Sequence, residues 1–470
     1  MESVKKNYIF QVSYQILNML LPFVTSPYIS RILGAENLGI YSYTYSVANI
    51  FILFINLGIE KYGSRMIAAA KENKNFLNKV FSELLILKII LGILVTVLYL
   101  IINHFILKYK LLFGIQTFLL LGATIDINWF FWGIEKFKIT VIRNFVFKLC
   151  TVLCVFLFVR AKDDLWIYIT IMALGTLISQ SLVWFVLRQY VCIKRVKCSD
   201  SLVHLKPLMI LFTGILAQSA YTYIDKIMLG SLGSMEQLGF CDNAYKIVSF
   251  PMGMITSLGV VMLPRMTMLY NNHSIEKASK YISSSMHFVL VLAFGMAGGM
   301  AAIGEDFSIV FLGESFATSG RIVAVISPIV LFMSWSDVVR NQYLIPKGLD
   351  KEYTTAIIIG AIINVVSNAL LIPKIGAFGA AIGTVLSYFS IAVYQTYVTR
   401  KELPYRQFIQ LIIPLFLFSM IMFFCVNAFG KWYENISVIG IIIQVCIGIV
   451  VYGTLVLVYL FLCSKAKGEH

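Results

Sequence analysis

Basic side chains inside long apolar segments are the residues of this sequence best suited to chemistry. A charge at the centre of a membrane helix costs about 2.5–3.5 kcal/mol even on lenient insertion scales, so it is expected only where it has a function or a partner. Cations outnumber acids there, which predicts a cavity for an anionic ligand, with arginine favoured where two donors grip one phosphate. The basic set is Arg31, Lys88, Lys148, Lys226, Lys246 and Arg340, and the acids are Asp126, Asp225 and Asp337.

Each of these residues also has a structural interpretation. Lys88, Arg31 and Arg340 fall near predicted helix ends, where a long side chain can extend to the membrane interface. Asp337 and Arg340 are three residues apart and can pair within one helix. Asp126 and Asp225 are candidates to bind a coupling cation, H⁺ or Na⁺, or simply to neutralise a neighbour. Composition and spacing leave these alternatives open.

Membrane helices are the elements that must position these side chains. The 470-residue chain is 59% hydrophobic and 13% charged, whereas soluble domains are about 45–50% apolar and 25% charged. About 20 apolar residues cross the hydrocarbon core as a helix, so the sequence predicts an all-α integral membrane protein of fourteen spans. These are 8–30, 38–60, 83–104, 112–133, 142–160, 165–187, 208–230, 238–263, 283–304, 321–345, 353–373, 376–398, 408–429 and 436–462.

The net charge of +15 follows the predicted loops. With the N-terminus inside, 25 of the 38 Lys and Arg residues fall in cytoplasmic segments and eight in outside segments. This bias is the positive-inside pattern and predicts that both termini lie in the cytoplasm. The basicity therefore indicates topology, and no nucleic-acid partner is predicted.

An internal repeat predicts two similar bundles. Segment 28–32 (YISRI) resembles segment 223–227 (YIDKI), and each is followed by Leu-Gly, at residues 33–34 and 232–233. Six predicted helices separate the copies, so they have the same orientation, as in transporters whose two halves face a central cavity. The alternative is chance similarity between apolar segments. The predicted domains are 1–198 and 199–398, each a six-helix bundle, and 399–470, two peripheral helices with a cytoplasmic tail.

Uncharged polar side chains predict which helices surround the cavity. In the first span they recur every three or four residues and therefore share one face. The alternative is hydrogen bonding between helices. The stripe is Gln11, Gln15, Asn18, Pro22, Thr25 and Ser26, and the seventh span has Gln218, Ser219 and Thr222. The eight cysteines form no CxxC pair and no ligand spacing with histidine, so neither a metal site nor a cofactor is predicted.

Several motifs resemble those of the Wzx-type polysaccharide flippases, in the multidrug/oligosaccharidyl-lipid/polysaccharide exporter superfamily. Residues 30–41 (SRILGAENLGIY) look like that family's Arg-x-Leu-Gly turn between its first two helices. Leu57-Gly58 with 63–65 (GSR) looks like the end of its second helix, and 364–384, with Pro373 and Gly376, is similar to its eleventh and twelfth helices. The resemblance covers nearly the whole chain.

The resemblance implies transport of an undecaprenyl-pyrophosphate-linked oligosaccharide repeat unit from the cytoplasmic to the outer leaflet by alternating access. The cargo would supply assembly of a capsule, O-antigen or exopolysaccharide, with a polysaccharide polymerase as a possible partner. Arg31 matches the family's motif arginine. Its counterpart in the repeat is Lys226, which keeps the charge and lacks the planar fork of arginine.

Other functions remain alternatives. A peptidoglycan-precursor (lipid II) flippase also has a basic cavity, and a MATE-type drug/cation antiporter should favour acidic residues. A membrane glycan polymerase or ligase needs catalytic groups outside, where the longest predicted loop offers only Glu305, Asp306, Glu314 and Arg321. The sequence has no phosphate-binding P-loop. We therefore predict a transporter rather than an enzyme and assign no catalytic residue.

Overall fold

The protein is described by a computed structural model that covers residues 2–105, 108–433 and 436–466; within these ranges, the side chains of residues 2–20, 22, 198, 217, 218, 220, 221, 260, 464 and 466 are outside the description. Every regular element in the described ranges is helical, which confirms the all-α prediction. The chain packs as two compact units, Met1–Ile227 and Met228–His470, with the boundary inside one helix. The predicted domain limits at 198 and 398 stay predictions.

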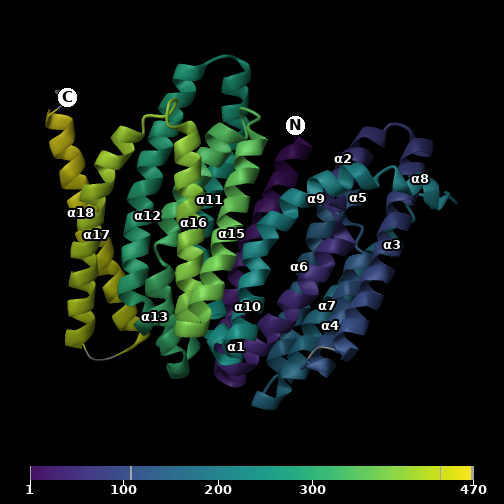
Figure 1. Ribbon diagram of the computed structural model, residues 1–470, viewed down its shortest axis with the longest axis horizontal. Helices are drawn as coiled ribbons and strands as arrows, with labels where there is room; N and C mark the ends of the chain where they lie inside the picture. The colour runs from purple at the N-terminus through teal and green to yellow at the C-terminus, as the bar shows by residue number, and fades with distance from the viewer. Residues whose placement is uncertain (1, 106–107, 434–435, 467–470) are drawn as a thin grey trace. The chain divides into compact units, whose positions relative to one another are not determined.

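The first unit consists mainly of long apolar helices joined by short segments (Figure 1). Its elements are α1 (Glu2–Asn56), α2 (Ile59–Ala70), α3 (Lys74–Phe105), α4 (Lys110–Thr124), α5 (Asn128–Gly133), α6 (Phe137–Phe158), η1 (Lys162–Asp164), α7 (Leu165–Leu187), α8 (Cys198–Leu202), α9 (Leu205–Ser219), η2 (Ala220–Ile224) and the start of α10 (Asp225–Leu232). A buried aromatic cluster on α3 and α5, with Phe81 stacked on Trp129, packs these helices together.

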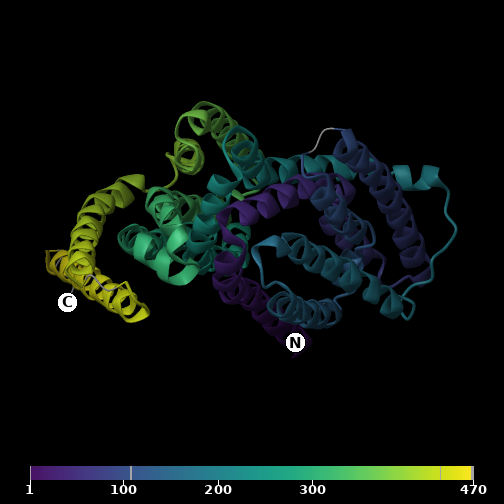
Figure 2. The ribbon, with the colours of Figure 1, turned by 90° about the horizontal axis from the view of Figure 1, so that it is seen from below.

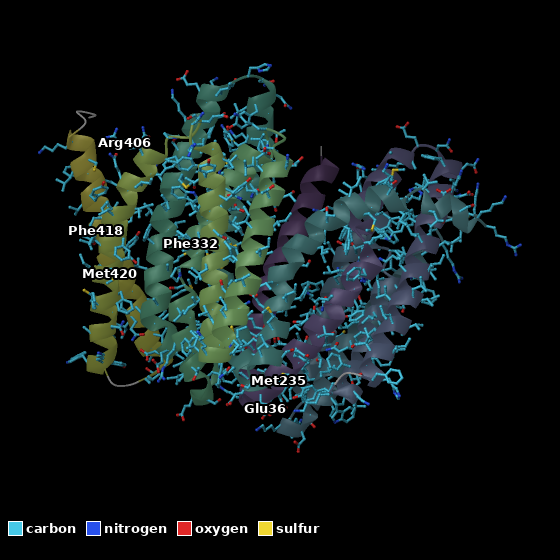
Figure 3. The ribbon with its side chains drawn as sticks, in the orientation of Figure 1. Glu36, Met235, Phe332, Arg406, Phe418 and Met420 are labelled. Carbon is cyan, nitrogen blue, oxygen red and sulfur yellow. The ribbon has the colours of Figure 1, made fainter. Side chains whose placement is uncertain are left out.

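The second unit continues through α10 and ends in a pair of edge helices. Its other elements are α11 (Met235–Asn271), α12 (Ile275–Leu312), η3 (Glu314–Phe316), α13 (Ala317–Ile326), α14 (Ile329–Val339), η4 (Arg340–Leu344), α15 (Asp350–Ile375), α16 (Ala377–Thr399), α17 (Tyr405–Tyr433) and α18 (Val438–Ala466). Within this unit α17 and α18 pack against α12 and against each other, and Figure 2 shows the pair at one edge. Phe418 and Met420, labelled in Figure 3, belong to α17.

A glycine breaks α1 where the sequence motif predicts a turn. Gly34 has φ 74° and ψ 173°, a conformation open in practice only to glycine. Figure 1 shows the chain descending from the N-terminus to this break and rising again toward α2, and Figure 3 labels Glu36 beside it. A Cβ at Gly34 would meet only the Lys162 side chain at 4.0 Å, so the backbone angles, and not lack of space, require the glycine.

Two π-helical turns interrupt the apolar helices, η2 between α9 and α10 and η4 between α14 and the segment before α15. In η4 the Ile345 N–H donates to the Arg340 carbonyl at 3.0 Å, five residues back instead of four. Such turns insert one extra residue and are found frequently at functional sites.

The described residues contain fewer separate candidate spans than the fourteen that the sequence predicts. Eleven helices in the searched residues are long and apolar enough to cross a membrane, or twelve if the bent pair Glu314–Ile326 and Ile329–Leu344 is one span. The predicted span 208–230 falls on α9, η2 and α10. Of this region only Leu205–Leu216 is a continuous apolar helix, and it is shorter than a candidate membrane span. The predicted span 8–30 begins outside the searched residues, which include Phe23–Ala70 as one long helix. The fourteen-helix count and the repeat stay predictions.

Candidate functional site

Lys88 lies at a break in the membrane-embedded chain. Between α4 and α5 the helix is interrupted at residues 125–127, so nearby carbonyl groups lack helical partners. Lys88 Nζ donates to the Asp126 carbonyl at 2.8 Å, and Trp184 Nε1 donates to the Ile125 carbonyl at 2.8 Å. An unsatisfied carbonyl in hydrocarbon costs several kcal/mol. Lys88 is 0% exposed, so its geometry favours stabilisation of this break over contact with a transported anion.

Acidic groups surround the Lys88 ammonium. Both Asp126 and Glu60 interact with it electrostatically. The Asp126 carboxylate has a second contact, because its Oδ1 accepts the Asn128 N–H at 2.9 Å and so caps the start of α5. A carboxylate at a helix N-terminus is also favoured by the helix dipole. Coupling of H⁺ or Na⁺ at Asp126 stays a prediction.

Arg143 extends the same network from α6. Its guanidinium donates to Asn128 Oδ1 at 3.0 Å, to Gln180 Oε1 on α7 at 3.2 Å, and to Asn144 Oδ1 at 2.6 Å. With Lys138 it lines a cavity of about 350 Å³ on α6 and α7. Amide oxygens from α5, α6 and α7 thus orient the guanidinium beside this cavity.

Arg31 lies one turn before the Gly34 break and is exposed. Three residues earlier, Tyr28 donates its hydroxyl to the Val159 carbonyl at 2.8 Å and packs on Phe156, with ring centroids 4.6 Å apart. On the other side of the break, Asn37 Nδ2 donates to the Lys162 carbonyl at 2.7 Å. The break and Arg31 are therefore fixed against the end of α6 and the segment that follows it.

The remaining predicted residues of the first unit are partly enclosed. Lys148 lies midway along α6 and is half-buried. Asp225, at the start of α10, is buried, and its neighbour Lys226 is half-buried. Of the predicted polar stripe, Gln11, Gln15, Asn18, Pro22 and Gln218 lie outside the described side chains.

In the second unit two predicted cations pair with acids on their own helices. Lys246 Nζ lies 2.9 Å from Asp242 Oδ2, one turn earlier on α11. Arg340 forms an ion pair with Asp337, whose Oδ1 also accepts the Asn341 side-chain N–H at 3.0 Å. Both acids are buried, and Arg340 also faces the Tyr353 ring at 5.9 Å. These ion pairs therefore compensate the charges of Lys246 and Arg340, which the sequence predicts as cations of the cavity.

The structure adds three residues that the sequence prediction missed. Arg143 lies at the start of the predicted span 142–160, and Glu60 is the last residue of the predicted span 38–60. Asp242 lies four residues before Lys246, the spacing of an intrahelical ion pair, and this spacing is the signal that could have identified it. Among the residues searched, no group of three His, Cys, Asp or Glu side chains could hold a metal ion.

The long apolar helices define an all-α, multi-pass membrane protein. A solved structure titled "Lipid II flippase MurJ, inward closed conformation" is similar with a TM-score of 0.74 and 15% identity, over 96% of this chain and 98% of that one. An inward-facing MATE family multidrug resistance transporter of the MOP superfamily is similar with a TM-score of 0.65 and 15% identity, over 84% of this chain and 97% of that one. At such low identity these likenesses establish the fold alone.

The family follows from the sequence itself. The profile described as "Polysaccharide biosynthesis protein" matches residues 4–270, more than half of the chain, and the chain belongs to this family. A relative from Shigella dysenteriae, named "Putative O-antigen transporter", is 25% identical over 397 residues, which are 83% of this chain and 98% of the relative.

Proposed function

We propose that this protein is a flippase that moves an undecaprenyl-pyrophosphate-linked oligosaccharide from the cytoplasmic to the outer leaflet of a bacterial inner membrane by alternating access. Family membership and the O-antigen transporter relative support a polysaccharide precursor as cargo. The proposal includes both termini in the cytoplasm and delivery of the cargo to a polymerase outside.

The observation that carries the proposal is a series of cations along α6. Arg143 lies near one end of this helix, Lys148 lies in its middle, and Arg31 lies on α1 close to the level of its other end, where Tyr28 is bonded to Val159. At 1.5 Å per step, the 15 residue-to-residue steps from Arg143 to Phe158 extend about 22 Å, most of the hydrocarbon thickness. A pyrophosphate would thus meet a basic group toward each end of this helix and another near its middle.

The energetics of the cargo fit such a path. Each sugar hydroxyl that loses water without gaining a partner costs about 1–3 kcal/mol, so an oligosaccharide needs a polar route through the bilayer. Outward movement of two negative charges gains about 4.6 kcal/mol per 100 mV of inside-negative potential. Ion coupling through Asp126 or Asp225 is therefore an optional part of this proposal.

The test is replacement of the chromosomal gene by variants in the host. R143Q/K148Q and, separately, R31E and K226E should insert normally but lower flipping at least tenfold, with complete repeat units accumulating in the inner leaflet and surface polymer lost. K277Q, which neutralises an exposed lysine at the start of α12, is the matched control. The readouts are leaflet-resolved lipid-linked oligosaccharide and surface polysaccharide. Normal surface polymer in a null strain without a second flippase gene would contradict the proposal.

A further inference from the structure

A basic pocket lies at the end of the first-unit helices, apart from the residues described above. Its volume is about 630 Å³, and it is formed by the start of α3 and by the segment that leads into α8. Figure 1 shows α8 beside that end of α3. The polar residues that the argument uses are Asn73, Asn75, Lys79, Lys194, Arg195 and Lys197.

Hydrogen bonds from α3 hold the basic segment in place. Asn78 Oδ1 accepts the Cys192 N–H at 3.1 Å, and Ser82 Oγ accepts the Lys194 N–H at 2.9 Å. Lys194 Nζ donates to Asn75 Oδ1 at 3.0 Å. The cations are therefore presented by a fixed backbone rather than by a free loop.

The positive charge of the pocket is only partly compensated. Lys79 lies 3.7 Å from Glu83, which also contacts His204, and Asp200 lines the pocket. In the described part of the chain, Lys194, Arg195 and Lys197 have no carboxylate within ion-pair distance, and all three are exposed. A pocket of this charge favours an anion with several acceptor oxygens, such as a phosphate group.

An apolar pocket is formed by the residues that directly precede the basic segment in the chain. Its volume is about 690 Å³, and its walls include Trp184, Phe185, Leu187 and Ile193, with Arg188 as its charged member. Phe185 is 69% exposed and Ile193 is 58% exposed, which is costly in water and favourable in lipid. Both pockets lie where the candidate span of α3 begins and that of α7 ends. This is the level at which the hydrocarbon core gives way to the lipid headgroups.

We propose that this surface binds an anionic phospholipid of the surrounding bilayer. The headgroup phosphate contacts Lys194, Arg195 and Lys197, and an acyl chain lies along Phe185 and Ile193. The adjacent apolar wall favours a lipid over a free phosphate, because a soluble anion would leave that wall exposed. The inference depends on the membrane spans and not on the transported cargo, so it stands even if the proposed function fails.

The test uses the full purified chain in detergent and counts bound lipids by native mass spectrometry. The probes are dioleoyl phosphatidylglycerol and dioleoyl phosphatidylcholine at equal mole fraction. Each surface cation contributes about a fivefold gain in affinity for an anionic lipid. K194Q/R195Q/K197Q should therefore weaken phosphatidylglycerol binding at least tenfold and leave phosphatidylcholine binding unchanged. The matched control is K277Q/K280Q/K351Q, which removes three exposed lysines of the second unit.

Two further measurements separate the possible ligands. F185A, which alters only an exposed apolar wall, should weaken dioleoyl phosphatidylglycerol and leave the short-chain dihexanoyl form unaffected. Equal losses in the pocket and control variants would overturn the site. Displacement of phosphatidylglycerol by millimolar inorganic phosphate alone would overturn the lipid assignment, since the ligand would then be a soluble anion.

Discussion

The ammonium group of Lys88 replaces a hydrogen bond that the chain cannot make where α4 ends. The Asp126 carbonyl would otherwise face a membrane-embedded interior, and the carboxylates of Asp126 and Glu60 would lack their buried cation. A buried ion pair adds little net stability compared with well-packed apolar residues, but removal of one partner is costly because the other charge stays buried. Lys88 should therefore matter for folding more than its single contact suggests.

At this residue we predict that K88M lowers the free energy of unfolding by about 3–5 kcal/mol. The control is K71M, which removes the exposed Lys71–Glu135 pair and should cost less than about 1 kcal/mol. Unfolding of the purified proteins in mixed detergent measures both. If the two variants lose the same stability, the assigned role of Lys88 is wrong.

A second residue-scale prediction concerns Gly34. Alanine at φ 74° and ψ 173° is strained, so G34A should lose about 1–3 kcal/mol of unfolding free energy. Gly453 is the matched control, because it is helical and a Cβ there would meet nothing within 4 Å, so G453A should be neutral or slightly stabilising. Thermal unfolding of both variants measures the difference, and equal midpoints would contradict the need for glycine at the turn.

At the scale of elements, an ion pair ties the connection between α16 and α17 to the segment before α15. Lys347 Nζ donates to the Glu402 carboxylate and also to the Tyr343 hydroxyl at 2.8 Å. The hydrogen bond from Lys347 is the main cause that lowers the pKa of Glu402 from its ordinary value, followed by the hydrogen bond from Tyr343. The pair thus links two loops that are far apart in the sequence.

This pair should give a small pH-dependent stability. A carboxyl group whose pKa is lowered by folding stabilises the protein above its unfolded pKa, about 4.3, and loses that contribution as pH falls through the lowered folded value. E402Q should therefore lower the free energy of unfolding at pH 7 by less than about 1 kcal/mol, because solvent screens the pair. The difference from the wild-type protein should shrink below about pH 4. A constant difference across pH 3–7 would contradict this prediction.

Some elements could be predicted from the sequence and others could not. Leu-Gly at 33–34 and Gly376 mark real breaks, because the backbone angles of Gly34 (φ 74°, ψ 173°) and Gly376 (φ 57°, ψ −128°) are open in practice only to glycine. The break at residues 125–127 contains no glycine or proline, and its stabilising partners, Lys88 and Trp184, come from distant helices. The sequence identifies the charged residues inside the predicted spans but not their partners. The exception is Asp337 with Arg340, whose spacing within one helix indicates the pair.

For the whole molecule, two independent features indicate a membrane protein: the exposed apolar side chains and the distribution of basic residues among the loops. On α17 and α18, Ile413, Phe424, Val450 and Phe461 are each at least 61% exposed, as lipid-facing residues should be. The positive-inside pattern then assigns the connection between α11 and α12 to the cytoplasm and the connection between α6 and α7 to the outside.

This orientation is testable by cysteine labelling. In a background whose native cysteines are replaced by serine, A161C should react with a membrane-impermeant maleimide in intact cells. N272C should react only after the membrane is permeabilised, because it follows α11 on the predicted cytoplasmic side. Both positions are exposed, so access across the membrane is the variable measured. The opposite labelling would invert the topology and the direction of proposed transport.

The π-helical turn η4 has a mechanical consequence. Its Ile345 to Arg340 hydrogen bond accommodates one residue more than an α-helical turn would hold. Each residue of an α-helix advances about 100° around the axis and 1.5 Å along it. If the extra residue moved from one side of Arg340 to the other, the Arg340 side chain would rotate by about that angle relative to the helix on the far side. Arg340 would then point away from Asp337, while Lys347 and its link to Glu402 stayed in place. A screw-like step of one residue could thus open this ion pair without bending a helix.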